Sequence, residues 1–128
     1  MRQELDDLLC QRYPDIFVDR HADRTLTGMC WGFCVDDGWF DLIDGLCAAI
    51  TAQVAAGISP PVVARQVKEK TGRLRFHFRG GNEETRHLVQ NAEDRSEEIC
   101  GSCGQATQRF PDMQYTLCGK CRDILPPQ

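Results

Sequence analysis

Several features that assign proteins to broad classes are missing from this sequence of 128 residues. Its apolar stretches are far shorter than the roughly 20 residues that a membrane-spanning helix needs, so we expect no membrane span. The N-terminal Met1–Glu4 leads into an acidic segment, and we therefore expect no signal peptide and a cytoplasmic location. No repeat or low-complexity segment is present, and 41% hydrophobic with 27% charged residues indicates a globular chain.

The sequence also lacks the usual signatures of a catalytic site. It contains no phosphate-binding loop, and no cysteine has an evident arrangement of His and Asp around it. We therefore expect a protein that is not an enzyme.

An excess of basic residues is missing as well. There are 15 Lys and Arg against 19 Asp and Glu, a net charge of −4, which argues against a general nucleic-acid binder. The charge is unevenly distributed, however, because residues 1–59 carry −6, residues 60–80 carry +5 and residues 81–128 carry −3. A local basic surface is therefore still expected near the middle of the chain.

Eight cysteines are present, and four of them form two C-x2-C pairs, Cys100 with Cys103 and Cys118 with Cys121. Each short pair offers two sulfurs to one tetrahedral ion, so the pattern predicts a structural zinc site. We expect two short strands, Thr107–Phe110 and Gln114–Leu117, to bring the pairs together across a turn. With four protein ligands the site has no open position for a substrate.

The remaining cysteines need a separate interpretation. They are Cys10, Cys30, Cys34 and Cys47. Because reduced cysteine behaves as a small hydrophobic residue, we interpret them as core residues. The alternative is a second metal site built on Cys30 and Cys34, with His21, Cys47 or Cys10 as companions.

Hydrophobic periodicity predicts helices over residues 2–12, 37–56 and 83–99, and a further helix that starts at Ser59 and ends at Gly72. Strands are expected at Thr25–Val35 and, with apolar and cationic residues alternating, at Arg73–Arg79. The predicted fold class is α+β: three to four helices around a small antiparallel sheet, with a C-terminal zinc knuckle or ribbon. We expect a core domain over residues 1–99, a docked zinc segment over 100–122 and a tail over 123–128.

Two charged groups are candidate contact surfaces. The acidic group lies at the start of the predicted central helix and consists of Asp36, Asp37, Asp41 and Asp44. It is interpreted as a solvated helix face, as a Mg²⁺ or acid–base site, or as a surface that docks onto a basic groove. The basic group lies on one face of the predicted strand and consists of Arg73, Arg75, His77 and Arg79. It either grips phosphates or an acidic partner, or is a solvated sheet face.

Several short motifs of this chain occur together in one known family. They are Trp31–Phe33, Asp37–Phe40, Leu42–Asp44 with Leu46-Cys47, Gln66–Lys70, Leu74–Phe76 and the two C-x2-C pairs. In these motifs, which span Cys30 to Cys121, the chain resembles small uncharacterised proteins encoded by bacteria, phages and prophages. The resemblance implies a protein that acts on a host protein, for instance as an anti-CRISPR or other counter-defence inhibitor.

The zinc segment alone also resembles the four-cysteine finger of DksA/TraR-type regulators, which bind RNA polymerase. Those proteins present acidic residues at the tip of a long coiled coil, and this chain has neither the heptads nor the length for one.

Our leading hypothesis is a non-enzymatic, zinc-binding interaction protein, phage or prophage encoded, that inhibits or modulates a host protein through a charged surface. The alternative is a nucleic-acid-binding or transcription-regulatory zinc protein that uses the cationic strand over residues 73–79.

Overall fold

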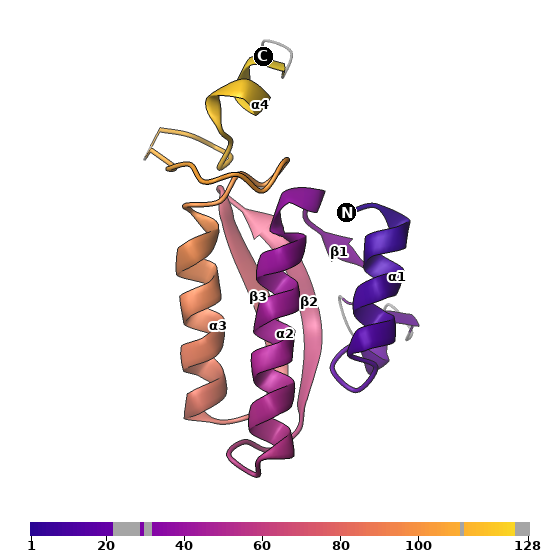
Figure 1. Cartoon of the computed structure of the whole chain (residues 1–128). Helices are drawn as coiled ribbons and strands as arrows, with labels where there is room; N and C mark the ends of the chain where they lie inside the picture. The colour runs from indigo at the N-terminus through magenta and orange to yellow at the C-terminus, as the bar shows by residue number, and fades with distance from the viewer. Residues whose placement is uncertain (22–28, 30–31, 111, 125–128) are drawn as a thin grey trace.

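The computed structural model describes residues 1–21, 29, 32–110 and 112–124. These residues form an α+β fold, which confirms the predicted fold class (Figure 1). The α-helices are α1 (Gln3–Arg12), α2 (Phe40–Ala55), α3 (Glu83–Ser96) and α4 (Gly119–Ile124). The strands are β1 (Phe33–Cys34), β2 (Val62–Lys70) and β3 (Arg73–Gly80), and the short 3₁₀ helices include η1 (Val18–His21) and η3 (Asp37–Trp39). Within these described ranges no helix is long and apolar enough to cross a membrane.

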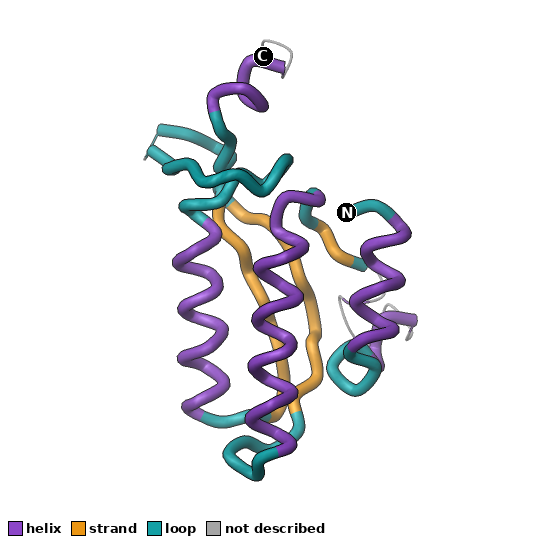
Figure 2. Tube along the Cα trace, viewed as in Figure 1, coloured by secondary structure: helices purple, strands orange, loops and turns teal. Residues whose placement is uncertain are grey.

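The strands form one sheet in the order β1-β2-β3, drawn in orange in Figure 2. The strands β2 and β3 pair antiparallel, whereas β1 lies parallel to β2 through the pairs Phe33–Val67 and Cys34–Lys68. The sheet is therefore mixed, and the antiparallel pairing expected from the sequence is found between β2 and β3. The strand predicted over residues 25–35 falls partly outside the described residues, and its described part is a strand only in β1.

The segment predicted as a helix that starts at Ser59 is instead strand β2, so this prediction was wrong. A bulge between Ala64 and Gln66 shifts the pairing register, and the buried residues therefore fall at Val62, Ala64 and Val67. Spacings of two and three residues hide the strict alternation that identifies a strand, and they resemble one face of a helix. The segment forms a strand because it is rich in valine, which favours strands, and because β3 supplies a pairing partner.

The turn between β2 and β3 is formed by Thr71 and Gly72, whose φ angles are both positive, 52° and 81°. Two consecutive residues of this kind occur in type I′ hairpin turns, where glycine is favoured because it has no Cβ. The backbone N–H of Gly72 donates to Oε1 of Glu69 at 2.6 Å. The glycine predicted to end a helix is therefore the tip of a hairpin.

Helices α2 and α3 pack against each other and α3 packs on β3, as Figure 1 shows in front of the sheet. The helices predicted over residues 2–12, 37–56 and 83–99 are thereby confirmed, and Asn82 caps α3 through a capping box. Buried apolar side chains from both layers fill the space between helices and sheet. They include Trp39, Ile43, Cys47, Ile50, Val67, Leu74, Phe76, Val89 and Ala92.

Helix α3 also satisfies the outer backbone of β3. The N–H of Leu74 donates to Oγ of Ser96 at 2.9 Å, and the N–H of Phe76 donates to Oε2 of Glu93 at 2.9 Å. The Ser96 hydroxyl in turn donates to the backbone carbonyl of Glu93 at 2.6 Å. Ser96 and Leu74 are both fully buried, so no water can replace this acceptor.

We predict that Ser96→Ala lowers the free energy of unfolding by about 1–3 kcal/mol, because the buried N–H of Leu74 loses its acceptor. Urea denaturation of the metal-loaded protein measures the change. The exposed α3 residue Asn91, changed to Ala, is the matched control and is expected to change stability by less than about 0.5 kcal/mol. Equal stability of the Ser96→Ala variant and the wild type would contradict this account.

Candidate metal centre

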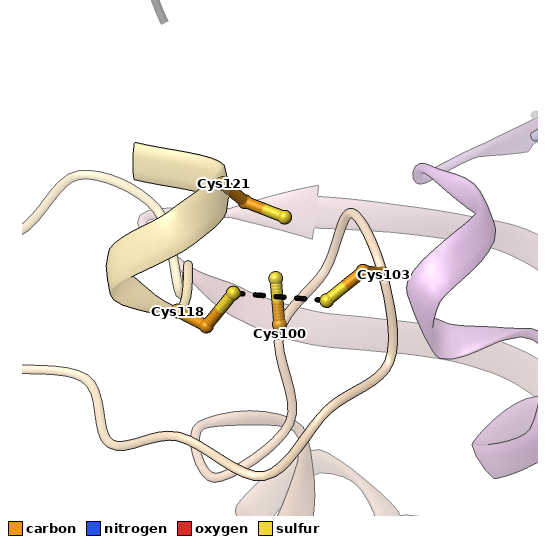
Figure 3. Close-up of side chains that lie close together, drawn as sticks. All are labelled: Cys100, Cys103, Cys118 and Cys121. Carbon is orange, nitrogen blue, oxygen red and sulfur yellow. Dashed lines mark hydrogen bonds between the residues drawn. The ribbon is translucent and has the colours of Figure 1, made fainter. Parts of the chain in front are cut away.

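The four cysteines of the two C-x2-C pairs lie together (Figure 3). Helix α4, which contains Cys121, lies at one end of the molecule (Figure 1). Their sulfur atoms are all within 4.8 Å of one another, and Sγ of Cys103 and Sγ of Cys118 are 3.7 Å apart. Cys100 is buried, Cys103 is exposed, and Cys118 and Cys121 are half-buried. All four are free thiols rather than disulfides, and they can hold a metal ion.

Local backbone structure places these sulfurs. After α3 ends, the chain turns so that the N–H of Gly104 donates to the carbonyl of Cys100 at 2.9 Å, with Gly104 at a φ of 83°. On the other side, the carbonyl of Cys118 accepts from the N–H of Arg122 at the start of α4. Cys118 and Cys121 are three residues apart on that first turn, so their side chains project to the same side.

Backbone amides favour the charged form of one thiol. Burial raises the pKa of Cys100, but hydrogen bonds from the backbone N–H groups of Ser102, Cys103 and Cys118 outweigh burial and lower it to about 6. Hydrogen bonds with the neighbouring thiols of Cys118 and Cys103 raise the pKa of Cys121 to about 12. The knuckle therefore favours a thiolate at Cys100, which is the form that binds metals.

The strands predicted on either side of residue 111 are not present in the described part of this segment, so this prediction was wrong. Residues 107–110 run instead along the end of α3, where the N–H groups of Thr107 and Arg109 donate to the carbonyls of Glu98 and Glu97. Backbone groups exposed by the end of a helix provide this alternative to a hairpin. Helix α4 was not predicted, because a helix of six residues is too short to show apolar periodicity.

Residues 99–122, which we call the cysteine segment, contact η3 through hydrogen bonds to their backbone carbonyls. The N–H of Gly38 donates to the carbonyl of Gly101 at 2.8 Å, and Nε1 of Trp39 donates to the carbonyl of Ile99 at 2.9 Å. A Cβ on Gly38 would lie 2.2 Å from the carbonyl oxygen of Cys100, so only glycine allows this approach. The division into domains at residue 100 remains a prediction.

The same segment holds the β2–β3 turn. The hydroxyl of Thr116, which is buried, donates to the carbonyl of Gly72 at 2.5 Å, and Nε of Arg109 donates to the carbonyl of Thr71 at 2.8 Å. The N–H of Gly101 donates to the carbonyl of Thr116 at 2.8 Å. The position of the hairpin turn is therefore coupled to the path of the chain between the two cysteine pairs.

The described residues show no second group of metal ligands. Cys47 lies on α2 and is fully buried in the hydrophobic core, and this burial strongly raises the pKa of its thiol. Cys10 is half-buried, and its sulfur lies 3.7 Å from Oδ1 of Asp6. Burial, and to a lesser extent the negative charge of Asp6, raises the pKa of Cys10 to about 11. Cys34 is exposed in β1, so its interpretation as a core residue was wrong. His21 is exposed in η1, and Cys30 lies outside the described residues.

Two aspartates of the predicted acidic group are held by cations from the N-terminal segment. Asp37 pairs with Arg2 at 3.3 Å and accepts from its backbone N–H at 2.8 Å. Asp44 accepts from Nη1 of Arg12 at 2.9 Å and from the hydroxyl of Tyr13 at 2.8 Å. Burial and the hydrogen bond to Asp44 raise the pKa of Tyr13 to about 12. These contacts join the N-terminal segment to η3 and α2, and they pair two of the four aspartates with a cation.

The other two aspartates of that group have different environments. Asp36 accepts from the N–H of Asp37 and thereby caps η3, as a helix-start aspartate was expected to do. Asp41 is exposed on α2. Among the described residues these side chains form no group that could hold a metal ion, so the structure gives no support to a Mg²⁺ site.

The predicted basic residues of β3 share one face of the sheet. Leu74 and Phe76 are buried toward the helices, whereas His77 and Arg79 are exposed. Residues of β2 that were assigned to a helix join them, because residues paired across antiparallel strands project to the same face. The pairs on this face are Lys70–Arg73, Lys68–Arg75, Gln66–His77 and Val63–Arg79. We call Lys68, Lys70, Arg73, Arg75, His77 and Arg79 the cationic sheet face.

Among the described residues, carboxylates contact the cationic sheet face at Arg73, next to the hairpin turn, and at Arg79. Arg73 pairs with Asp94 at 2.8 Å and Glu97 at 3.6 Å, and Arg79 pairs with Asp19 at 3.8 Å. Within the described ranges, no ion pair involves Lys68, Lys70 or Arg75. Like charges placed opposite one another across strands destabilise a sheet, so packing does not explain this arrangement.

No family model matches the chain, and comparisons with curated proteins and with solved structures give no match either.

We predict that Cys103→Ser combined with Cys121→Ser lowers the metal content from one ion per chain to near zero, because two ligands of four are lost. Elemental analysis of purified protein measures this content. Cys34→Ser is the matched control, since Cys34 is also an exposed thiol but lies outside the cluster. Retention of a full equivalent of metal by the double variant would rule out this cluster as the binding site.

Proposed function

We propose that the four clustered thiols bind Zn²⁺ as a structural ion. Four sulfurs around zinc, with bonds of about 2.3 Å in a tetrahedron, stand about 3.8 Å apart. The separation of 3.7 Å between the sulfurs of Cys103 and Cys118 supports this geometry. Bound zinc would fix the cysteine segment, which has few regular hydrogen bonds of its own, and would leave no open coordination position for chemistry.

We predict that removal of zinc loosens the contact between the cysteine segment and Trp39, whose indole N–H donates to the carbonyl of Ile99. The fluorescence of Trp39 should then shift to longer wavelength, measured in a Trp31→Phe background because the chain contains two tryptophans. The shift should also occur on acidification, since protons compete with the metal for the thiolates. Zinc added back at neutral pH is the control and should restore the original spectrum. Unchanged fluorescence after confirmed metal loss would contradict a structural role.

We further propose that the protein is a binding protein, and that the cationic sheet face is its working surface. The observation that carries this proposal is the group Lys68, Lys70 and Arg75. Lys68 faces Arg75 across the strands, Lys70 lies in the next row, and among the described residues none of the three has a carboxylate partner. An anionic ligand would remove the repulsion among them. Nucleic acid fits this requirement best, because it presents closely spaced negative charges.

The acidic group is the weaker candidate for a contact surface. Asp37 and Asp44 already pair with Arg2 and Arg12, so a basic partner would have to displace these intramolecular contacts. The proposal therefore favours the nucleic-acid alternative over inhibition of a host protein through an acidic face. The resemblance to bacterial and phage proteins supports a host component as the partner, and an acidic host protein remains the competing candidate.

We predict that tagged protein recovered from bacterial lysate retains nucleic acid, and that Arg75→Glu reduces the retained amount at least several-fold. The matched control is Arg86→Glu, a charge reversal of an exposed arginine near the start of α3, away from the cationic sheet face. It should leave retention unchanged. Absorbance at 260 nm and elemental phosphorus measure the nucleic acid.

Nuclease treatment of the lysate separates the two candidate partners. Loss of all bound material after nuclease supports the proposal. One stoichiometric protein that survives nuclease would overturn the nucleic-acid proposal, and it would identify the host target of an inhibitor.

A further inference from the structure

We infer that the ligand of the cationic sheet face is the phosphate backbone of a nucleic-acid duplex, and not a single strand. This inference deepens the proposed function and rests on it. It depends on which side chains lie on the cationic sheet face and which lie on the face toward the helices.

The first observation concerns the aromatic residues of the hairpin. Phe76 is buried, and Phe78, also packed against the core, pairs with buried Ala64 on that same side of the sheet. The paired rows of the opposite face contain Lys, Arg, Gln, Val and one His, but no Phe, Tyr or Trp. Proteins that bind single strands without sequence preference use aromatic side chains on which bases stack. These paired rows lack such a platform, and the exposed aromatics Phe110 and Tyr115 lie outside them, in the segment that contacts the hairpin turn. Phosphate contacts need only the cations of the rows.

The second observation concerns the density of positive charge. The rows Lys70–Arg73 and Lys68–Arg75 are neighbours on the same face. Adjacent strands lie about 5 Å apart and successive rows about 7 Å apart. Of these four cations, Arg73 is paired with Asp94 and Glu97, and the other three therefore lie in a small patch two strands wide. A duplex carries one charge per about 1.7 Å of axis, against about 3.4 Å for one strand. The denser array of phosphates can engage more of these cations at once.

The third observation concerns the limits of the patch. At one end Arg73 is shared with Asp94 and Glu97, and at the other end Arg79 pairs with Asp19. These carboxylates repel phosphates near Arg73 and near Arg79, and they restrict the contact to the three cations without a carboxylate partner and to a short stretch of backbone. With about three cations engaged, the logarithm of the duplex affinity should fall with the logarithm of the salt concentration with a slope of about −3.

Fluorescence anisotropy with zinc-loaded protein tests this inference. The probes are a short DNA duplex of mixed sequence and one of its strands alone, each titrated at several salt concentrations. We expect the duplex to bind at least fivefold more tightly, with the slope given above. Lys68→Glu and Arg75→Glu should each weaken duplex binding at least tenfold, and the control Arg86→Glu should not.

A second variant adds the missing stacking platform. His77 is exposed on the cationic sheet face, next to Arg75 in the rows. We expect His77→Trp to strengthen single-strand binding roughly tenfold, the effect of one stacked base, and to leave duplex binding within about twofold.

The outcomes distinguish the two proposals. If the single strand binds as tightly as the duplex and Arg75→Glu abolishes both, the nucleic-acid function stands and the duplex inference is wrong. If neither probe binds at low salt, the proposed function itself fails, and with it this inference. If Arg86→Glu weakens binding as much as Arg75→Glu, the cationic sheet face is not the contact surface.

Discussion

The closure of the chain between Cys100 and Cys121 is the constraint on which the rest of this architecture depends. Between the two cysteine pairs the described backbone has no helix or strand, so its path is set by the sulfur cluster and by single hydrogen bonds. Those bonds reach two distant places, η3 through Gly38 and the β2–β3 turn through Thr116 and Arg109. One closed loop thus holds the start of α2 and the tip of the hairpin in fixed relation.

Much of the fold was predictable because its periodicity is local. Alternation in β3 and the apolar stripe of α2 each appear within one window of the sequence, and both predictions were confirmed. Strand β2 was not predictable in this way, since its bulge at Ala64 and Gln66 breaks the period that marks a strand. The path of residues 107–117 depends on contacts with α3 and with the hairpin turn, which no local pattern encodes.

The two candidate sites also differ in how far the sequence alone predicts them. The spacing of the cysteine pairs was sufficient to predict the cluster, because the ligands of a tetrahedral site come in short turns. The charged surfaces could be described only from the structure, because the residues that pair with one another lie far apart in the sequence. Arg2 and Arg12 reach across to Asp37 and Asp44, and Lys68 joins Arg75 only through the strand register. The positive charge over residues 60–80 is thus carried by one hairpin, β2–β3, and mostly on its face opposite the helices.

The hydrogen bonds from β3 to Ser96 and Glu93 have a consequence for association between copies of the chain. An open strand edge is a template on which another chain can add a strand, and a sequence that alternates Leu and Phe with other residues is prone to such aggregation. In this molecule the outward N–H groups of Leu74 and Phe76 are already occupied by side chains of α3. Growth of the sheet at this edge is therefore blocked, and the hairpin stays accessible on its broad outer side rather than along its rim.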